Sequence, residues 1–420
     1  MIDVKAHTLS NGLTLLHHYD ASTRMVCVNL MMNVGSRDES PSRTGLAHLM
    51  EHLMFTGSLN APNYDLPLQA AGGESNAWTS VDVTNYYETL PAQNLETALW
   101  LESDRLLHLS LHDDGIATQK KAVIEEFKQN CLNQPYGDLG HCVGSTAYTR
   151  HPYRWPVIGL RPDDIANASH DEIIKFFHDH YAVNNAVLCI SGHVDFDDTV
   201  RLVEKWFGDI EPVPLRARNI AQEPAQTEPR LARFTREVPE DMLYLTFHMC
   251  GRGEADYAAC DQLSDVLSSG MSSRLYRNVL LKSGMFTSLD ASVTGNFDPG
   301  LFLIRGRLAH GVKYDDALQV IKHELDVLVA DGVTPYEHEK ATNKYESNAL
   351  FENIGYAAKA AKLCLYEMLG KAQPGTNYHA ASINTEIEHY HALTPQLLQE
   401  AASRLFTPSN TTVIYYGPNA

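Results

Sequence analysis

The stretch GLAHLMEHLMFTGS, residues 45–58, carries two histidines and a glutamate within five positions. Its apolar residues recur at helical spacing and Thr44 is a candidate N-terminal cap, so the stretch predicts a short helix. Residues four apart lie on one face of a helix. His48 and His52 can therefore present two imidazole nitrogens to a single ion, and Glu51 flanks the same face.

The order of these residues, H-x-x-E-H, is the inverzincin signature, the reverse of the more common H-E-x-x-H. Neutral imidazoles suit zinc, and catalytic zinc sites have three protein ligands and an open position for water. Glu51 would act as the general base toward that water. Five residues also recur by chance, so the alternative is a partly buried helix with surface histidines, in a chain that has 20 of them.

A third ligand can come from a second helix. GIATQKKAVIEEFKQN, residues 115–130, is helical in pattern and has Glu125 and Glu126 at its centre. The spacing favours Glu126, which lies three residues after Val123 and one before Phe127 on the apolar side. The alternative is that both glutamates are solvated, as adjacent glutamates usually are.

The 420 residues are too many for one ordinary core, and 44% hydrophobic with 20% charged residues is typical of a globular chain. The segment 211–229 has four prolines and little apolar periodicity, which predicts a linker. It separates a domain at 1–210 from one at 230–420. Both halves alternate strand-like and helix-like segments in a similar order, which indicates an α+β fold.

The local patterns predict several elements. Asn11-Gly12 marks a hairpin, and the compact apolar run 186–194 indicates a buried strand. The expected helices cover 94–109, 171–181, 256–270, 317–332 and one long tract at about 336–370.

Charge and cysteine usage narrow the partners and the compartment. Lys+Arg is 33 and Asp+Glu is 52, so the formal net charge is −19, which disfavours nucleic acid and anionic membrane surfaces. No apolar run is long enough to span a membrane, and the N-terminus does not resemble a signal peptide. The seven cysteines are scattered without a CxxC pair. These features predict a cytoplasmic protein with reduced thiols and no membrane span.

The chain resembles the pitrilysin-type inverzincin metallopeptidases, the family of insulin-degrading enzyme and the mitochondrial processing peptidase. The stretch 45–58 matches the zinc helix of the family, and AAGGESNAWTSVDVTNYYETLP, residues 70–91, matches a strand segment. The resemblance covers nearly the whole chain. It implies two related α/β-sandwich halves joined by a linker, with a zinc-binding N-terminal domain and a C-terminal domain without a metal site.

The resemblance also implies a site. One zinc ion per chain is held by His48, His52 and Glu126, and Glu51 is the catalytic general base. The expected activity is zinc metalloendopeptidase hydrolysis of short or unfolded peptides.

For substrate, the family places the peptide along an edge strand. Asn76 and Ala77 match the positions that meet the peptide backbone, and Phe55 and Trp78 match positions near the cleaved residue. For Phe55 and Trp78, ordinary core packing is the alternative.

The chain departs from the family at two places. Gln119 stands where the family has a glutamate that supports the metal site; Gln can donate or accept a hydrogen bond but brings no charge, so zinc affinity or rate can change. Self-sufficient members also carry an Arg and a Tyr seven residues apart in the second half. Those positions are Leu280 and Thr287 here. Arg274 and Arg277 lie nearby, without a Tyr at that interval.

Paired family members suggest how the missing residues are supplied. One subunit bears the zinc motif and a related subunit contributes the Arg and the Tyr, so the chain is expected to be the zinc-bearing subunit of a heterodimer. Two alternatives stay open: a self-sufficient homodimeric peptidase, and a non-catalytic binding or scaffold subunit.

Overall fold

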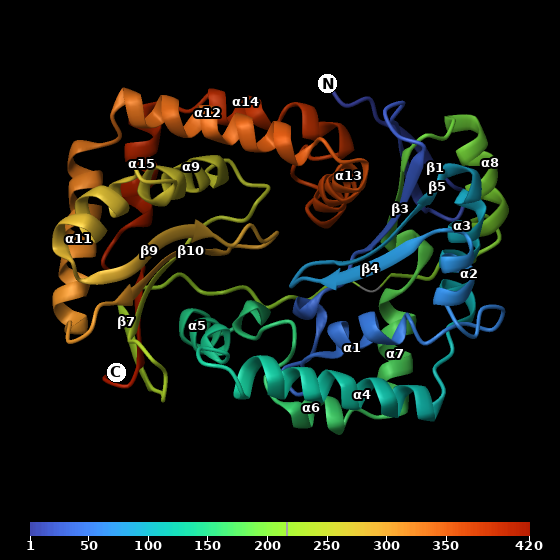
Figure 1. The fold of residues 1–420 in the computed structure, drawn as a ribbon, viewed down its shortest axis with the longest axis horizontal. Helices are drawn as coiled ribbons and strands as arrows, with labels where there is room; N and C mark the ends of the chain where they lie inside the picture. The colour runs from blue at the N-terminus through green and yellow to red at the C-terminus, as the bar shows by residue number, and fades with distance from the viewer. Residues whose placement is uncertain (216) are drawn as a thin grey trace. The chain divides into compact units, whose positions relative to one another are not determined.

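Two mixed β-sheets organise the chain, one in each of two compact units (Figure 1). The structure is a computed structural model that describes residues 1–215 and 217–420. Unit 1 consists of Met1–Gln129, Trp155–Ile220 and Leu350–Asn384, and unit 2 consists of Asn130–Arg154, Ala221–Ala349 and Thr385–Ala420. The predicted α+β fold with two halves is confirmed.

The sheet of unit 1 has six strands in the order β1-β2-β6-β3-β5-β4. The predicted hairpin at Asn11-Gly12 joins β1 to β2, which are antiparallel. Strand β6 runs parallel to β2, and the remaining pairs are antiparallel. Strand β4 pairs with β5 alone and leaves one edge of the sheet open. The strands are β1 (Lys5–Thr8), β2 (Thr14–Tyr19), β3 (Met25–Met32), β4 (Glu74–Thr79), β5 (Thr84–Pro91) and β6 (Ala186–Gly192).

Both faces of this sheet are covered, which explains why its central strands are apolar on both sides. On one face, Val26, Val28 and Leu30 of β3 join the core that the helices of the first 210 residues build. On the other face, α13 (Tyr356–Ala372) packs against β3 and β6 (Figure 1). The helices of the first face are α1 (Leu46–Leu53), α2 (Asp65–Ala70), α3 (Leu95–His108), α4 (Asp113–Phe127), α6 (Pro162–Ala166), α7 (His170–His180) and α8 (Phe196–Phe207).

Unit 2 repeats this arrangement with five strands in the order β7-β11-β8-β10-β9. Helices α9, α11 and α15 contribute to the core on one face, and α5 contacts β7, β8 and β11. The bounds are α5 (Leu139–Ala147), β7 (Arg230–Thr235), β8 (Met242–His248), α9 (Tyr257–Ser268), α10 (Leu281–Ser283), β9 (Phe286–Val293), β10 (Leu301–Leu308), α11 (Tyr314–Asp331), α12 (Pro335–Glu352), α14 (Glu386–His391), α15 (Pro395–Leu405) and β11 (Thr411–Gly417).

The helical tract predicted at 336–370 is not one helix. It is divided into α12 and α13 because Gly355 adopts an extended conformation, with φ −75° and ψ 135°, and becomes the N-cap of α13. The described residues of 211–229 form no helix or strand, and residue 216 of that segment lies outside the described part. The division into domains 1–210 and 230–420 with a 211–229 linker stays a prediction.

Two further observations concern compartment and redox state. Across residues 1–215 and 217–420, no helix is both long and apolar enough to cross a membrane. None of the seven cysteines forms a disulfide bond with a described residue, and six of them are buried.

Candidate metal centre

Helix α1 carries the candidate centre, and a sharp turn precedes it. Gly45 is its N-cap with φ +88°, a left-handed conformation that favours glycine. A Cβ at this position would lie 2.8 Å from Cδ1 of Ile165. The backbone N–H groups of Gly45 and Ala47 donate to the two carboxylate oxygens of Glu39, each at 2.9 Å. A buried carboxyl side chain therefore caps the helix.

Thr44 does not cap the helix, contrary to the prediction. Its hydroxyl donates to Oδ2 of Asp164 at 2.6 Å and accepts from the backbone N–H of Leu160 at 2.7 Å. The side chain is thus used to tie the α1 turn to the segment around α6.

The structure brings together the three predicted metal ligands. One ligand atom from each of His48, His52 and Glu126 lies within 4.8 Å of the others. Helix α1 contacts α4, which carries Glu126. The Nε2 atoms of His48 and His52 lie 3.8 and 3.5 Å from Oε2 of Glu126. The neighbouring Glu125 points elsewhere and pairs with Lys128 at 2.7 Å.

This donor set fits a zinc ion. Two ligand atoms held about 2.1 Å from a tetrahedral zinc lie roughly 3.4 Å apart. The observed separations of 3.5 and 3.8 Å are close to that value. Two imidazoles and a carboxylate also match the ligand set of catalytic zinc sites.

Burial prepares one imidazole for metal binding. The pKa of His48 falls to about 4, mainly because burial disfavours the charged ring and also because His52 lies beside it. A neutral imidazole has a free lone pair, which a metal ligand needs. The Nδ1 atom of His48 is buried and makes no hydrogen bond to a described residue.

Gln119 lies on α4, seven residues before Glu126 and so about two helical turns away. It is half-buried, and its side chain forms no hydrogen bond with the residues that the structure describes. The structure therefore gives its side chain no hydrogen bond to the described residues of the cluster.

The predicted general base, Glu51, is anchored from outside α1. Oε2 of Glu51 accepts a hydrogen bond from the Thr79 hydroxyl at 2.5 Å. The pKa of Glu51 is raised, chiefly by burial, while the hydrogen bond from Thr79 and the nearby His52 act in the opposite direction. Thr79 is a residue to which the sequence alone gave no role.

The predicted substrate residues are distributed over both faces of β4. Ala77 shares a face with Thr79 because side chains alternate along a strand. Asn76 and Trp78 are on the opposite face, and Trp78 is 38% exposed. The Asn76 side chain nevertheless turns back, because its Oδ1 accepts the backbone N–H of Ala77 at 2.8 Å.

Phe55 follows α1 and is half-buried in an aromatic cluster. Its ring lies 5.5 Å from that of Tyr64 and 6.2 Å from that of Tyr86, and Tyr86 is the β5 residue opposite Ala77. The Arg105 guanidinium lies 5.4 Å from the Phe55 ring. The structure therefore places Phe55 on the α1 side of the sheet, and Trp78 on the other.

The two positions at which the family has the Arg and the Tyr lie in unit 2. Leu280 ends a π-helical turn at Leu275–Leu280, and Thr287 is exposed on β9. Arg274 cannot substitute for the missing arginine, since its Nε pairs with Glu337 at 2.7 Å and its NH2 group donates to the carbonyl of Gly332.

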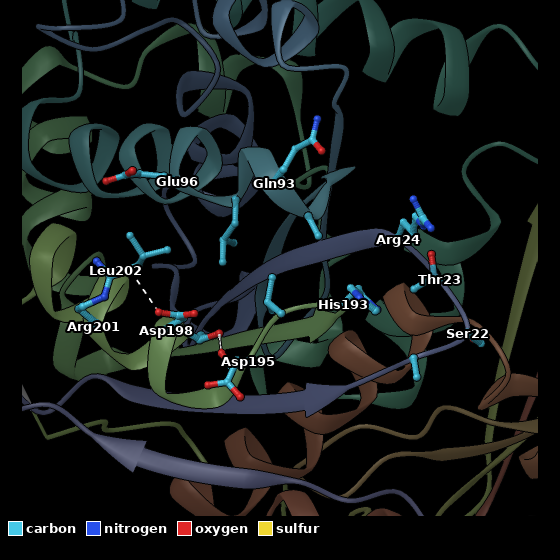
Figure 2. A pocket seen from close by; sticks show the side chains of 15 residues that line it. Ser22, Thr23, Arg24, Gln93, Glu96, His193, Asp195, Asp198, Arg201 and Leu202 are labelled. Carbon is cyan, nitrogen blue, oxygen red and sulfur yellow. Dashed lines mark hydrogen bonds and ion pairs between the residues drawn. The ribbon is translucent and has the colours of Figure 1, made fainter.

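A cavity of about 850 Å³ lies elsewhere on unit 1. Figure 2 shows that its charged lining includes Arg24, Glu96, Asp198 and Arg201. Several of these groups are already paired: Arg201 contacts Asp198 at 3.3 Å, and Glu96 contacts Lys205 at 2.5 Å. None of the predicted site residues lines this cavity.

A fold of two sheet-bearing halves, with two histidines from the helix of an H-x-x-E-H motif beside a glutamate from a second helix, defines an inverzincin-type chain. Sequence profiles agree with this class: the one described as Insulinase (Peptidase family M16) matches residues 14–159, and the one described as Peptidase M16 inactive domain matches 167–345. The chain belongs to peptidase family M16, the pitrilysin family, as the sequence predicted.

Individual relatives carry related names. The chain is 27% identical to zinc protease PqqE of Helicobacter pylori over 98% of this chain and 92% of that protein. It is 25% identical to the uncharacterized zinc protease YmxG of Bacillus subtilis over 97% of this chain and 98% of that one. Among solved structures, a protease from Helicobacter pylori superposes with a TM-score of 0.91 at 25% identity, covering 99% of this chain and 100% of the other.

Proposed function

We propose that this chain is a zinc-dependent endopeptidase. The observation that carries the proposal is the convergence of His48, His52 and Glu126, with their ligand atoms within 4.8 Å, beside a carboxylate that is not a ligand. The names of the M16 relatives as zinc proteases support the same activity.

The bound zinc would supply a Lewis acid that polarises the scissile carbonyl and lowers the pKa of a water molecule. Glu51 accepts the proton of the water as its oxygen attacks the carbonyl carbon. The same carboxyl then delivers this proton to the leaving nitrogen as the C–N bond breaks.

The open edge of β4 is the proposed binding site for the peptide backbone. A peptide that lies along this edge extends the sheet by one strand, with Asn76 and Ala77 as its partners. Phe55 and Trp78 are the proposed neighbours of the cleaved residue. Strand addition requires an extended chain, so the proposed substrates are short or unfolded peptides.

The first test pairs activity with metal content. Glu51→Gln is expected to keep zinc and to lose cleavage of a quenched fluorescent peptide library by roughly a hundredfold to ten-thousandfold. Glu126→Gln is expected to lose zinc, while its neighbour Glu125→Gln, the matched control, keeps both zinc and activity. Full activity in Glu51→Gln would refute the proposed mechanism.

We further propose that the active enzyme contains two chains. Leu280 and Thr287 occupy the positions of the transition-state Arg and Tyr. Leu280 has no hydrogen-bond donor, and Thr287 has a hydroxyl but on a much shorter side chain than tyrosine. A related subunit would supply both the Arg and the Tyr. The solved periplasmic protease PqqL from Escherichia coli has the same fold in a longer chain, of which this chain covers 48% at 17% identity and a TM-score of 0.81. One fold unit of this kind can therefore account for half of a larger assembly.

One experiment distinguishes the heterodimer from the homodimer and from a non-catalytic subunit. The chain is purified alone and with a co-expressed related subunit, and the native mass and peptide cleavage of both samples are measured. Activity only in the mixed complex supports the heterodimer. Activity in a homodimer supports a self-sufficient enzyme, and zinc-bound complexes without turnover support a binding or scaffold subunit.

A further inference from the structure

The Glu51 carboxylate has a single anchor. The Thr79 hydroxyl donates to its Oε2 at 2.5 Å, and no other described residue donates a hydrogen bond to Glu51. A glutamate side chain has three rotatable bonds and considerable conformational entropy. Without the hydroxyl, the carboxylate would be free to turn away from the cluster.

Thr79 is itself on the strand proposed to bind the peptide. It ends β4, two residues after Ala77, and both side chains point toward α1. The backbone N–H of Ala77 is bonded to the Asn76 side chain rather than to β5, so it lies on the open edge. The strand therefore carries a substrate contact and the anchor of the base a short distance apart.

The hairpin beyond Thr79 fixes the anchor in place. Thr79 pairs with Thr84 across the hairpin. Inside the turn, the Ser80 hydroxyl oxygen accepts the backbone N–H groups of Asp82 and Val83 at 3.1 and 3.0 Å.

The tip of the turn is also locked to the body of unit 1. Arg37 and Asp82 form an ion pair at 2.8 Å, with side-chain exposures of 3% and 6%. Removing one partner of a buried pair is costly because it leaves the other charge uncompensated. The end of β4 therefore has little freedom to move relative to the rest of the sheet.

We propose that Thr79 is a positioning residue: its hydroxyl holds the Glu51 carboxylate toward the metal cluster and couples the base to the strand that binds the peptide. This role rests on the proposed peptidase function. The alternative is that the Thr79 hydroxyl only donates a hydrogen bond to a half-buried carboxylate and so stabilises the fold, without an effect on catalysis.

The test compares three variants in the assembly that gives activity. Thr79→Val is isosteric and removes the hydroxyl, Thr79→Ser restores it, and Thr89→Val is the matched control. Thr89 also donates to a glutamate between the same two strands, Glu74 at 3.2 Å, but away from α1. Zinc content, kcat and KM are measured for each.

We expect Thr79→Val to lower kcat roughly tenfold to a hundredfold, as the loss of a hydrogen bond to a charged group does. KM and zinc content should change by less than about twofold because the strand edge and the ligands stay in place. Thr79→Ser should recover most of kcat, and Thr89→Val should match the unmodified chain. An equal loss in Thr89→Val, or no recovery with serine, would overturn the positioning role.

A stability cycle gives a readout that does not depend on turnover. The melting temperatures of metal-free Thr79→Val, Glu51→Ala and the double variant are compared. If the two side chains act as one pair, the shifts are not additive; additive shifts would overturn the proposal. An unmodified chain that is inactive in every assembly would refute the proposed function and the positioning role with it, while a non-additive cycle would still establish the contact.

Discussion

At the scale of single residues, Glu39 holds the first turn of α1 without belonging to the His-His-Glu cluster. Helix α1 has only eight residues, so its capping matters more than in a long helix. Both carboxylate oxygens of Glu39 accept backbone N–H groups at its first turn. The side chain is 7% exposed, so its charge has little contact with water.

Burial raises the pKa of Glu39 to about 8, against the effect of the two N–H bonds. Its usual pKa is 4.5, so the folded chain binds this proton more tightly than the unfolded chain does. The stabilisation from this proton is complete below pH 4.5 and is lost as the pH rises from there through 8, on the order of 5 kcal/mol in total.

We therefore predict that Glu39→Gln flattens the pH dependence of stability. At pH 5 the unmodified chain should melt at a higher temperature, because the hydroxyl oxygen of a protonated Glu39 still has a lone pair for an N–H group, whereas the amide nitrogen of glutamine has none. The difference should shrink as the pH approaches 8. Glu125→Gln, at a side chain that is 70% exposed, serves as the control and should leave the profile unchanged. Parallel profiles for Glu39→Gln and the unmodified chain would contradict the assignment.

At the scale of elements, β4 carries both an open edge and the Thr79 hydroxyl that bonds to Glu51. One edge is paired to β5, and the other is open, with the Ala77 N–H covered only by the Asn76 side chain. A peptide that adds to this edge must displace that side chain and take over the N–H. The free-energy cost of this displacement is small, because the Ala77 N–H exchanges its bond to the Asn76 side chain for a bond to a peptide carbonyl.

Ala77→Pro tests this geometry because proline removes the donor. Proline is tolerated on an edge strand when its missing N–H faces away from the sheet. We expect the variant to fold and to keep its zinc, while kcat/KM for peptide cleavage falls at least about tenfold. Circular dichroism and metal analysis provide the folding control. An unchanged kcat/KM would show that the peptide does not bind through this edge.

The same elements show what the sequence could and could not predict. Helices α1 and α4 were predictable because their apolar residues recur at local spacing, and the short motif placed His48 and His52 on one face. The Glu39 cap and the Thr79 anchor were not, since each depends on how separate elements pack. Thr44 has the residue type and position of a helix N-cap. Its hydroxyl is instead hydrogen-bonded to Asp164, which is distant in the sequence.

At the scale of the whole molecule, each unit takes a covering helix from the other half of the sequence. Helix α13 covers β3 and β6 in unit 1, with Ala360, Leu363 and Cys364 fully buried. In unit 2, α5 contacts β7, β8 and β11, and Cys142 lies in a buried cluster with Tyr244 and Tyr416. A contiguous half of the chain therefore leaves one face of its own sheet open.

Because each sheet is covered by a helix from the other half of the sequence, we predict that the two contiguous halves do not fold separately. Fragment 1–214 lacks α13 and would expose the apolar face of β3 and β6, and fragment 215–420 lacks α5. Exposed faces of this kind cause aggregation. We expect each fragment expressed alone to be insoluble, and the two fragments expressed together to form a soluble complex that binds one zinc ion. The break lies in a segment whose described residues form no helix or strand, so it removes no element of either sheet. A soluble, zinc-binding 1–214 fragment would show that α13 is dispensable, and the contiguous domain boundary would then be the better description of the molecule.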